Sequence, residues 1–284
     1  MSTFFFTSDL HGKKPRYRAL FQTIRDERPD GVLLGGDLLP SQWGELSSGE
    51  DFLFDFLVPS LETLRAALKD RYPSIGVILG NDDPRIEEQR FQQVASQGLW
   101  RYLHGAKELW GETPVFGYSF VPPSPFLLKD WERYDVSRFV DPGCVSPEEG
   151  RRSVPLSPME ARHSTIQKDL EKLVGEERVS HAIFLFHAPP YSTALDRAAL
   201  DGKMVDHVPL DVHVGSIAIK RFIETHQPRV TLHGHIHESI RITGSYKEKA
   251  GNTVMIGGAH DGPELSLVSF DPECPWSTAH RRLL

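Results

Sequence analysis

Short apolar runs alternate with longer amphipathic stretches along most of the chain. Five of these runs, rich in Val, Ile, Leu and Phe, lie at residues 4–6, 32–34, 77–79, 182–186 and 230–232. Runs of this length and composition are typical of β-strands that are buried on both faces. Between the first two runs, apolar residues recur at helical spacing, and this predicts a helix between Pro15 and Pro29; they are Tyr17, Leu20, Phe21 and Ile24.

A second helix is predicted ahead of the third strand, which we extend to residues 75–79. Pro59 is expected to kink or divide this helix. Its apolar positions are Leu53, Phe56, Leu57, Leu61, Leu64 and Leu68. The alternation of strand and helix predicts a parallel sheet, in which the carboxyl ends of the strands share one edge.

The alternation fades at residues 104–158, which are rich in Pro, Gly and aromatic residues. Because large aromatic side chains need something to bury against, we expect an insertion that folds over the body as a lid or forms an oligomer contact. Ser157-Pro158 then predicts the start of a helix with Met159, Ile166, Leu170 and Leu173 on its apolar face.

The C-terminal part predicts strands without intervening helices. Residues 240–243, 253–256 and 265–270 are strand-like and separated by Gly-containing turns, which indicates antiparallel pairing. We therefore expect one α/β domain over residues 1–284, with a βα half and a mostly antiparallel finish.

The charge, the cysteine content and the apolar runs of the chain each disfavour certain partners or sites. The 284 residues include 32 Lys and Arg against 39 Asp and Glu, and the net charge of −7 disfavours binding to nucleic acid and to anionic membranes. Cys144 and Cys274 form no CxxC pair, so neither a disulfide framework nor a structural zinc site is indicated. No apolar run is long enough for a membrane span or an export signal, and a cytoplasmic location is expected.

Candidate metal ligands follow each of the five apolar runs. They are Asp9, His11, Asp37, Asn81, His187, His235 and His237. In Asp9-Leu10-His11 and in His235-Ile236-His237, two ligands stand at i and i+2, so on an extended backbone both side chains point the same way. Asp37 follows Gly35-Gly36 in a tight turn, and a carboxylate can bridge two cations.

Each of these motifs has an ordinary structural explanation when it is taken alone. Asp-x-His, Gly-Asp and Asn-Asp sequences usually form turns or caps, and His187 could be a core histidine at a strand end. Their shared position after strands, together with the Gly-His-x-His element, favours a dinuclear metal site.

At this point the sequence resembles the calcineurin-like metallophosphoesterase superfamily. The resemblance runs from Asp9 to about Ala259, and its motifs are Asp9-Leu10-His11, Gly36-Asp37, Gly80-Asn81-Asp82-Asp83, His187 and Gly234-His235-Ile236-His237. It implies a four-layer α/β/β/α sandwich with mixed parallel and antiparallel sheets and helices outside.

The resemblance also implies two divalent metal ions, which could be Mn, Fe, Zn, Ni or Mg. One ion would be held by Asp9, His11, Asp37 and His237, and the other by Asp37, Asn81, His187 and His235. Such a centre hydrolyses phosphoesters by attack of a metal-bridging hydroxide. The expected catalytic residues are Asp37, Asn81, Asp82 and His187.

One departure from the family pattern bears on the substrate. Most members carry a His after the motif Asn, where it can protonate the leaving oxygen, whereas this chain has Asp82 and resembles bacterial and archaeal members that lack that His. An ionised carboxylate, with two cations lowering its pKa further, is a poor proton donor. We therefore expect a phosphodiesterase for small or nucleotide-like substrates with good leaving groups.

Several alternatives remain open. The chain could be a phosphomonoesterase or pyrophosphohydrolase, or a non-catalytic protein-binding scaffold on the same fold, although a complete ligand set argues against a scaffold. His207 or His213 could supply the missing acid or lie on a surface loop. His260 could contact substrate or lie in a solvated loop.

Two polar residues near these motifs carry further expectations. Asp83 is expected to orient a liganding His. Ser216 is expected to cap a helix through Ile217, Phe222 and Ile223, whose free amides could otherwise meet a substrate phosphate.

Overall fold

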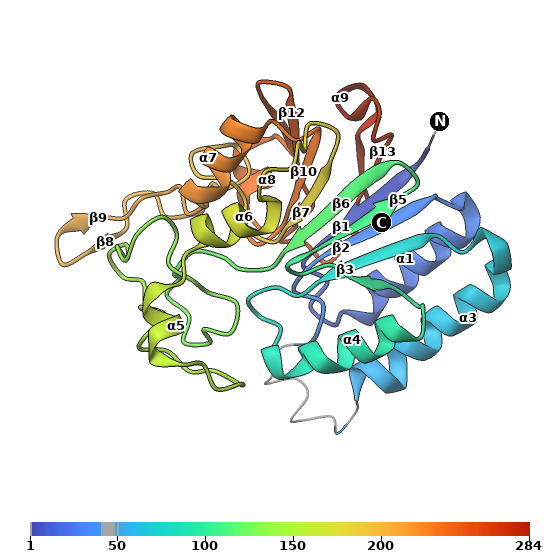
Figure 1. Cartoon of the computed structure of the whole chain (residues 1–284), viewed down its shortest axis with the longest axis horizontal. Coiled ribbons are helices and arrows are strands. Elements are labelled where there is room, and N and C mark those ends of the chain that lie inside the picture. Colours follow the sequence, from blue (N-terminus) through green and yellow to red (C-terminus); the bar gives the residue numbers. More distant parts are fainter. Residues whose placement is uncertain (1, 41–48, 50) are drawn as a thin grey trace.

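The computed structural model of the chain describes residues 2–40, 49 and 51–284, and it contains two six-stranded sheets that lie face to face (Figure 1). The first sheet has the order β14-β13-β1-β2-β3-β4. Its strands are β1 (Phe4–Thr7), β2 (Gly31–Gly35), β3 (Ser74–Ile78), β4 (Arg101–Tyr102), β13 (Ser266–Phe270) and β14 (His280–Leu283). The strands β1 to β4 are parallel, whereas β13 pairs antiparallel with β1 and with β14.

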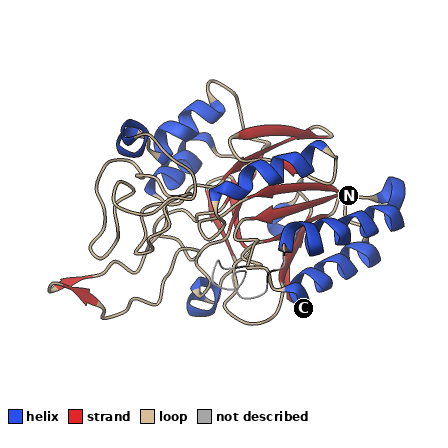
Figure 2. Cartoon of the chain, turned by 90° about the horizontal axis from the view of Figure 1, so that it is seen from below, coloured by secondary structure: helices blue, strands red, loops and turns tan. Residues whose placement is uncertain are grey.

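The second sheet has the order β11-β12-β10-β7-β6-β5. Its strands are β5 (Ala106–Trp110), β6 (Thr113–Tyr118), β7 (Ile183–Phe186), β10 (Val230–His233), β11 (Lys247–Ala250) and β12 (Thr253–Gly257). The four central strands are parallel, and the edge strands β5 and β11 are antiparallel to their neighbours. A separate two-stranded hairpin, β8 (Met204–Val205) and β9 (Val208–Pro209), projects from the body (Figure 2).

Helices cover the outer faces of both sheets. On the side of the first sheet lie α1 (Lys14–Glu27), α3 (Val58–Leu68) and α4 (Glu88–Ser96), and on the side of the second lie α6 (Ile166–Val174) and α7 (Ile217–His226) (Figure 1). The shorter helices are α5 (Pro158–His163), α8 (Ser239–Thr243) and α9 (Pro275–Thr278), the π-helical turn η1 (Phe52–Leu57), and the 3₁₀ turns η2 (Lys69–Arg71) and η3 (Arg85–Glu87). No described helix has the length and apolar character needed to cross a membrane.

The buried side chains separate into two clusters, as the alternation of a strand requires. Phe4 and Phe6 point between the sheets, where they pack with residues such as Leu185 and Leu232, while Phe5 points outward to the helical layer. Helix, sheet, sheet and helix therefore form four layers. The predicted α/β/β/α sandwich with mixed sheets is confirmed.

One prediction for the C-terminal part was wrong, and the predicted antiparallel pairing holds for all but one of its strand pairs. Residues 240–243 belong to the helix α8, in which Ile242 N–H donates to the Glu238 carbonyl and Gly244 ends the helix at φ 73°. A period-2 pattern over so few residues does not distinguish a strand from one helical turn. The chain returns along β11 after α8, so β12 pairs antiparallel with β11 and parallel with β10. The last predicted strand, found as β13, pairs antiparallel with both of its neighbours.

The predicted insertion at 104–158 also needs correction. Its first part forms the hairpin β5–β6 at the edge of the second sheet, so only residues 119–157 lie outside the regular layers. The helix expected after Ser157 is two helices, because Ser157 caps α5 and Thr165 caps α6. Met159 is 69% exposed and does not lie on a core face. The division of the second predicted helix near Pro59 is confirmed by the junction of η1 and α3.

Candidate metal centre

All seven predicted ligands lie in loops that follow parallel strands, at the carboxyl edge of the sandwich. The loops after β1, β2 and β3 carry Asp9, His11, Asp37 and Asn81, and the loops after β7 and β10 carry His187, His235 and His237. Two groups of side chains have ligand atoms within 4.8 Å of one another: Asp9, His11, Asp37 and His237 form one, and Asp37, His187 and His235 form the other. Asp37 belongs to both groups.

The first group joins the two sheets. His237 Nε2 lies 3.2 Å from Asp9 Oδ1 and 3.0 Å from His11 Nε2. Burial alone would raise the pKa of Asp9, but the hydrogen bond and charge of His237 outweigh it and hold that pKa well below its usual range. Asp9 is therefore an ionised carboxylate that faces two imidazole nitrogens.

The second group presents several acceptor atoms to one point. His187 Nδ1 lies 2.7 Å from the Gly35 carbonyl, which fixes the proton on Nδ1 and leaves Nε2 as an acceptor. Nε2 lies 3.3 Å from Asp37 Oδ2 and 3.0 Å from Asn81 Oδ1. Three such acceptors need a proton or a cation between them. Burial lowers the pKa of His187, but the charge of Asp37 outweighs it and raises this pKa to about 10, so the site favours a positive charge.

Glycines allow the ligand-bearing loops to approach one another. A Cβ at Gly80 would lie 2.3 Å from Asp37 Oδ1, and a Cβ at Gly36 would lie 2.6 Å from His187 Nδ1. Neither position can accept a larger side chain without moving a ligand. The mixed nitrogen and oxygen donors, their burial and this close approach fit a pair of divalent cations.

Left-handed backbone marks four of the seven ligands. Asp9, His11, Asp37 and His235 have φ of 57°, 47°, 53° and 72°. The extended i and i+2 arrangement that the sequence suggested is therefore wrong, although the side chains still converge. The loops are held in this shape by each other, since Asp9 N–H donates to the Gly36 carbonyl at 2.9 Å and His11 N–H to the Asp37 carbonyl at 2.8 Å. Such strain, of order 1–3 kcal/mol per residue, clusters at functional sites.

Asp83 has a different role from the one expected. Its buried carboxylate does not contact a ligand His but accepts N–H groups from Leu38 and Leu39 at 2.9 and 2.8 Å, and from Gly80 at 2.9 Å. Burial, followed by the charge of Asp37, raises the pKa of Asp83 to about 7. Asp83 thus fixes the loop after β2 against the loop after β3.

Arg16 was not among the predicted site residues. This buried side chain of α1 donates through Nη1 to the Asp9 carbonyl at 2.6 Å and through Nη2 to the Gly262 carbonyl. Arg16 therefore holds the Asp9 loop to the loop after β12. Arg16 lies four residues before Leu20 and therefore on the apolar face of the helix. A charged residue on that face was the sequence signal for a buried role.

The match to known proteins agrees with this geometry. The sequence model described as calcineurin-like phosphoesterase matches residues 2–239. The chain belongs to this family. It is accordingly a hydrolase acting on phosphoester bonds. No curated protein matches the sequence.

Two solved structures show the same fold as this phosphoesterase. The Thermus thermophilus protein TT1561 is 15% identical with a TM-score of 0.53, and the alignment covers 99% of this chain and 98% of that chain. A dimetal phosphatase from Danio rerio is 13% identical with a TM-score of 0.52, with 94% and 91% covered.

Asp82 lies beside the candidate metal centre of the phosphoesterase. Its Oδ2 is 3.6 Å from His11 Nδ1, its Oδ1 accepts from Asn81 Nδ2 at 3.0 Å, and its N–H donates to Asp37 Oδ1 at 2.8 Å. Burial, followed by the charge of Asp37, raises the pKa of Asp82 to about 6. Bound cations would act in the opposite direction and favour the carboxylate.

Three further histidines were candidates for acids or substrate contacts, namely His207, His213 and His260. His207 lies at the tip of the β8–β9 hairpin, which projects from the body (Figure 2). The His213 ring is bound through Nδ1 to buried Asp196 at 2.7 Å. His260, in the loop after β12, pairs with Glu264 at 3.0 Å.

Ser216 caps α7 as predicted, by accepting from Ile219 N–H. The alternative phosphate role of the α7 amides fails, because Asp135 accepts from Ile217 N–H at 2.6 Å and from Ala218 N–H at 3.2 Å. A carboxylate of the chain itself already occupies this helix terminus.

Proposed function

We propose that the protein is a dinuclear metal-dependent phosphodiesterase that acts on small or nucleotide-like substrates. The observation that carries the proposal is the position of Asp37, whose carboxylate belongs to both groups of candidate ligands. Two divalent ions held there, whether Mn, Fe, Zn, Ni or Mg, supply charge that lowers the pKa of water and offsets the charge on the phosphoryl oxygens.

The residues divide between the two ions as the family resemblance implies. Asp9, His11 and His237 would hold one ion with Asp37, and Asn81, His187 and His235 would hold the other with Asp37. The Gly35 carbonyl orients His187, and the Asp82 N–H orients Asp37. These hydrogen bonds set the ligand atoms before any cation or substrate arrives.

The preference for diesters rests on Asp82, which stands where most family members carry His. A carboxylate held anionic by neighbouring cations donates no proton to a leaving oxygen, so good leaving groups are favoured. The open alternatives, a phosphomonoesterase or a pyrophosphohydrolase, require a proton from water or from another His.

The function is tested with Mn²⁺-loaded protein on bis(p-nitrophenyl) phosphate, p-nitrophenyl phosphate and pyrophosphate, together with metal analysis. We expect two metal ions per chain, and faster cleavage of the diester than of the other two compounds. Asp37→Asn should abolish turnover and lower the metal content while circular dichroism stays native. Asp70→Asn, at an exposed position before β3, is the matched control.

Three outcomes would overturn parts of the proposal. Full activity of Asp37→Asn would contradict the shared carboxylate. Faster cleavage of the monoester or of pyrophosphate would assign one of the alternatives. Protein that neither retains metal nor hydrolyses any of the three compounds would point to a scaffold.

An oligomer contact through the insertion at residues 104–158 stays a prediction. Phe126, Leu127 and Phe139 of this segment are 58%, 53% and 69% exposed. Light scattering on the purified chain at several concentrations would reveal a dimer, and Phe126→Ser should weaken it if this segment forms the contact.

A further inference from the structure

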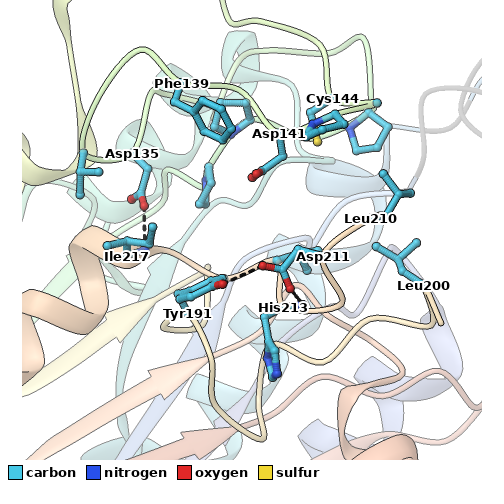
Figure 3. Close-up of a pocket in the computed structure, with 18 of the residues that line it drawn as sticks. Asp135, Phe139, Asp141, Cys144, Tyr191, Leu200, Leu210, Asp211, His213 and Ile217 are labelled. Atoms are coloured by element: carbon cyan, nitrogen blue, oxygen red, sulfur yellow. Dashed lines mark hydrogen bonds between the residues drawn. The ribbon is translucent and has the colours of Figure 1, made fainter. Parts of the chain in front are cut away.

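A cavity of about 430 Å³ lies between the segment 119–157 and the loop that follows β7 (Figure 3). None of the seven candidate metal ligands lines it. Its volume falls within the range of small-molecule sites. The cavity therefore has room for a chemical group that is separate from the reacting phosphate.

Both walls of the cavity are fixed to loops that carry metal ligands. Tyr191, on one wall, is four residues after His187, so their Cα atoms lie within about 14 Å of each other. On the same side, Ala199 N–H donates to Glu238 Oε1 at 3.0 Å. Glu238 is the residue that follows the candidate ligand His237.

The opposite wall is anchored in the same way. Asp130, in the segment 119–157, accepts a hydrogen bond from the Arg85 N–H at 2.8 Å. Arg85 is four residues after the candidate ligand Asn81. Segments on both sides of the cavity are therefore hydrogen-bonded to loops that carry candidate metal ligands.

The lining is apolar with negative charge and contains no Lys or Arg. Leu200, Leu210 and several prolines supply apolar surface, and Phe139 and Tyr191 supply aromatic rings. In Figure 3 these two rings lie on opposite sides of the space. Aromatic faces bind organic cations, and they do so more strongly where water is excluded.

Three carboxylates line the cavity, and one of them has no partner. Asp135 accepts a hydrogen bond from Ile217 N–H at the N-terminus of α7. Asp211 accepts from Tyr191 OH at 2.7 Å and from His213 N–H at 2.8 Å. The Asp141 carboxylate has no hydrogen bond or ion pair within the described part of the chain, and it points toward the Tyr191–Asp211 pair. The Asp141 side chain is exposed, and partial desolvation, followed by the charge of Asp211, raises its pKa.

We propose that this cavity binds an organic ammonium group on the alcohol side of the phosphodiester substrate. The inference rests on the proposed diesterase function and names a substrate class for it. A compact quaternary or primary ammonium with a hydrocarbon arm matches the apolar walls, the Phe139 ring and the carboxylate of Asp141 together. The Tyr191 ring already has Lys220 Nζ 5.9 Å from its centroid. An anionic arm would be repelled by Asp141 and Asp211.

The test uses two diesters of equal shape and different charge. These are p-nitrophenyl phosphocholine and p-nitrophenyl 3,3-dimethylbutyl phosphate, an isostere whose alkyl arm carries no charge. We expect kcat/KM for the choline ester to exceed that for the isostere by about tenfold, a size typical of cation–π and ionic contacts in a partly desolvated site.

Asp141→Asn should remove most of this ratio and leave kcat/KM on bis(p-nitrophenyl) phosphate unchanged. Phe139→Ala should reduce the ratio by a smaller factor. Asp70→Asn changes the net charge equally at a distant site and should leave the ratio intact.

The possible outcomes distinguish failure of the ammonium site from failure of the proposed diesterase function. Cleavage of both diesters at equal rates by wild type and by Asp141→Asn overturns the ammonium site while the diesterase function stands. If no diester is cleaved, the function fails, and titration with choline followed by NMR decides the cavity alone. Saturable binding that is weakened by Asp141→Asn supports the site, and no binding by the wild-type chain overturns it.

Discussion

The position of Asp82 determines which leaving groups the proposed enzyme can handle. Its carboxylate stands next to His11 and Asp37, where a His would protonate the leaving oxygen. Aryl diesters, whose leaving groups need no proton, should be cleaved much faster than alkyl esters. Asp82→His should accelerate the alkyl substrates by roughly 10²-fold, and by up to 10⁴-fold with good geometry, while changing aryl rates little. Rates on a series of leaving groups of graded basicity measure this effect.

His207→Ala is a suitable control for that series, because His207 lies at the tip of a hairpin that projects from the body. The idea would be wrong if the wild-type enzyme cleaved aryl and alkyl esters equally fast and lost both activities in His213→Ala. That result would mean that another histidine supplies the proton.

Residue identities at the site were readable from the sequence, but their backbone shapes were not. Asp9, His11, Asp37 and His235 could be named because each follows a recognisable strand. Their left-handed conformations arise from hydrogen bonds between loops that are distant in sequence, and no local pattern encodes such bonds. The roles of Asp83 and Arg16 escaped prediction for the same reason.

At the scale of elements, His104 attaches the segment 119–157 to the second sheet. Its Nδ1 accepts the Ser119 N–H at 3.0 Å, and its ring contacts Phe120 and Trp131. Burial, followed by the charges of nearby arginines, lowers the pKa of His104 to about 3. The folded chain therefore keeps this ring neutral, whereas the unfolded chain protonates it near pH 6.5.

Stability should consequently fall on acidification. Between the unfolded and folded pKa values the unfolded state binds more protons, so the free energy of unfolding decreases as pH drops below about 6.5 and continues to decrease toward pH 3. From about pH 7.5 to 5.5, His104 should account for a loss of about 1 kcal/mol. Urea unfolding of wild type and of His104→Asn, which keeps an acceptor but does not titrate, measures the difference.

His181→Asn, the same substitution at an exposed position, is the matched control. If wild type and His104→Asn lost stability in parallel over this pH range, His104 would not be held neutral in the folded chain.

Long periodic elements were predicted well, and short ones were not. The helix between Pro15 and Pro29 repeats its pattern over several turns, and it is found as α1. Residues 240–243 offered less than two turns. The hairpin β5–β6 was missed in an aromatic-rich stretch because no residue of the edge strand β5 is fully buried, so its apolar pattern is weak. Tertiary contacts decide such short segments.

For the whole molecule, the candidate metal centre lies where the two sheets meet. Asp9, Asp37 and Asn81 come from the first sheet, and His187 and His237 come from the second. A cation that binds both sets stabilises only the folded arrangement, because the unfolded chain separates the ligands. Saturation at about a hundred times the dissociation constant contributes about 2.7 kcal/mol. In a chain of this size that contribution raises Tm by about 5 °C.

Thermal unfolding of metal-stripped protein with and without Mn²⁺ should therefore show a rise in Tm of about this size. The rise should be much smaller in Asp37→Asn, which removes the shared carboxylate, and unchanged in Asp70→Asn. Asp37→Asn also removes the buried partner of the His187 ring, 3.3 Å away, so its metal-free Tm should be lower than that of the wild type. Equal Tm values for the wild type with chelator and with Mn²⁺ would show that the two sheets are not joined through a bound cation.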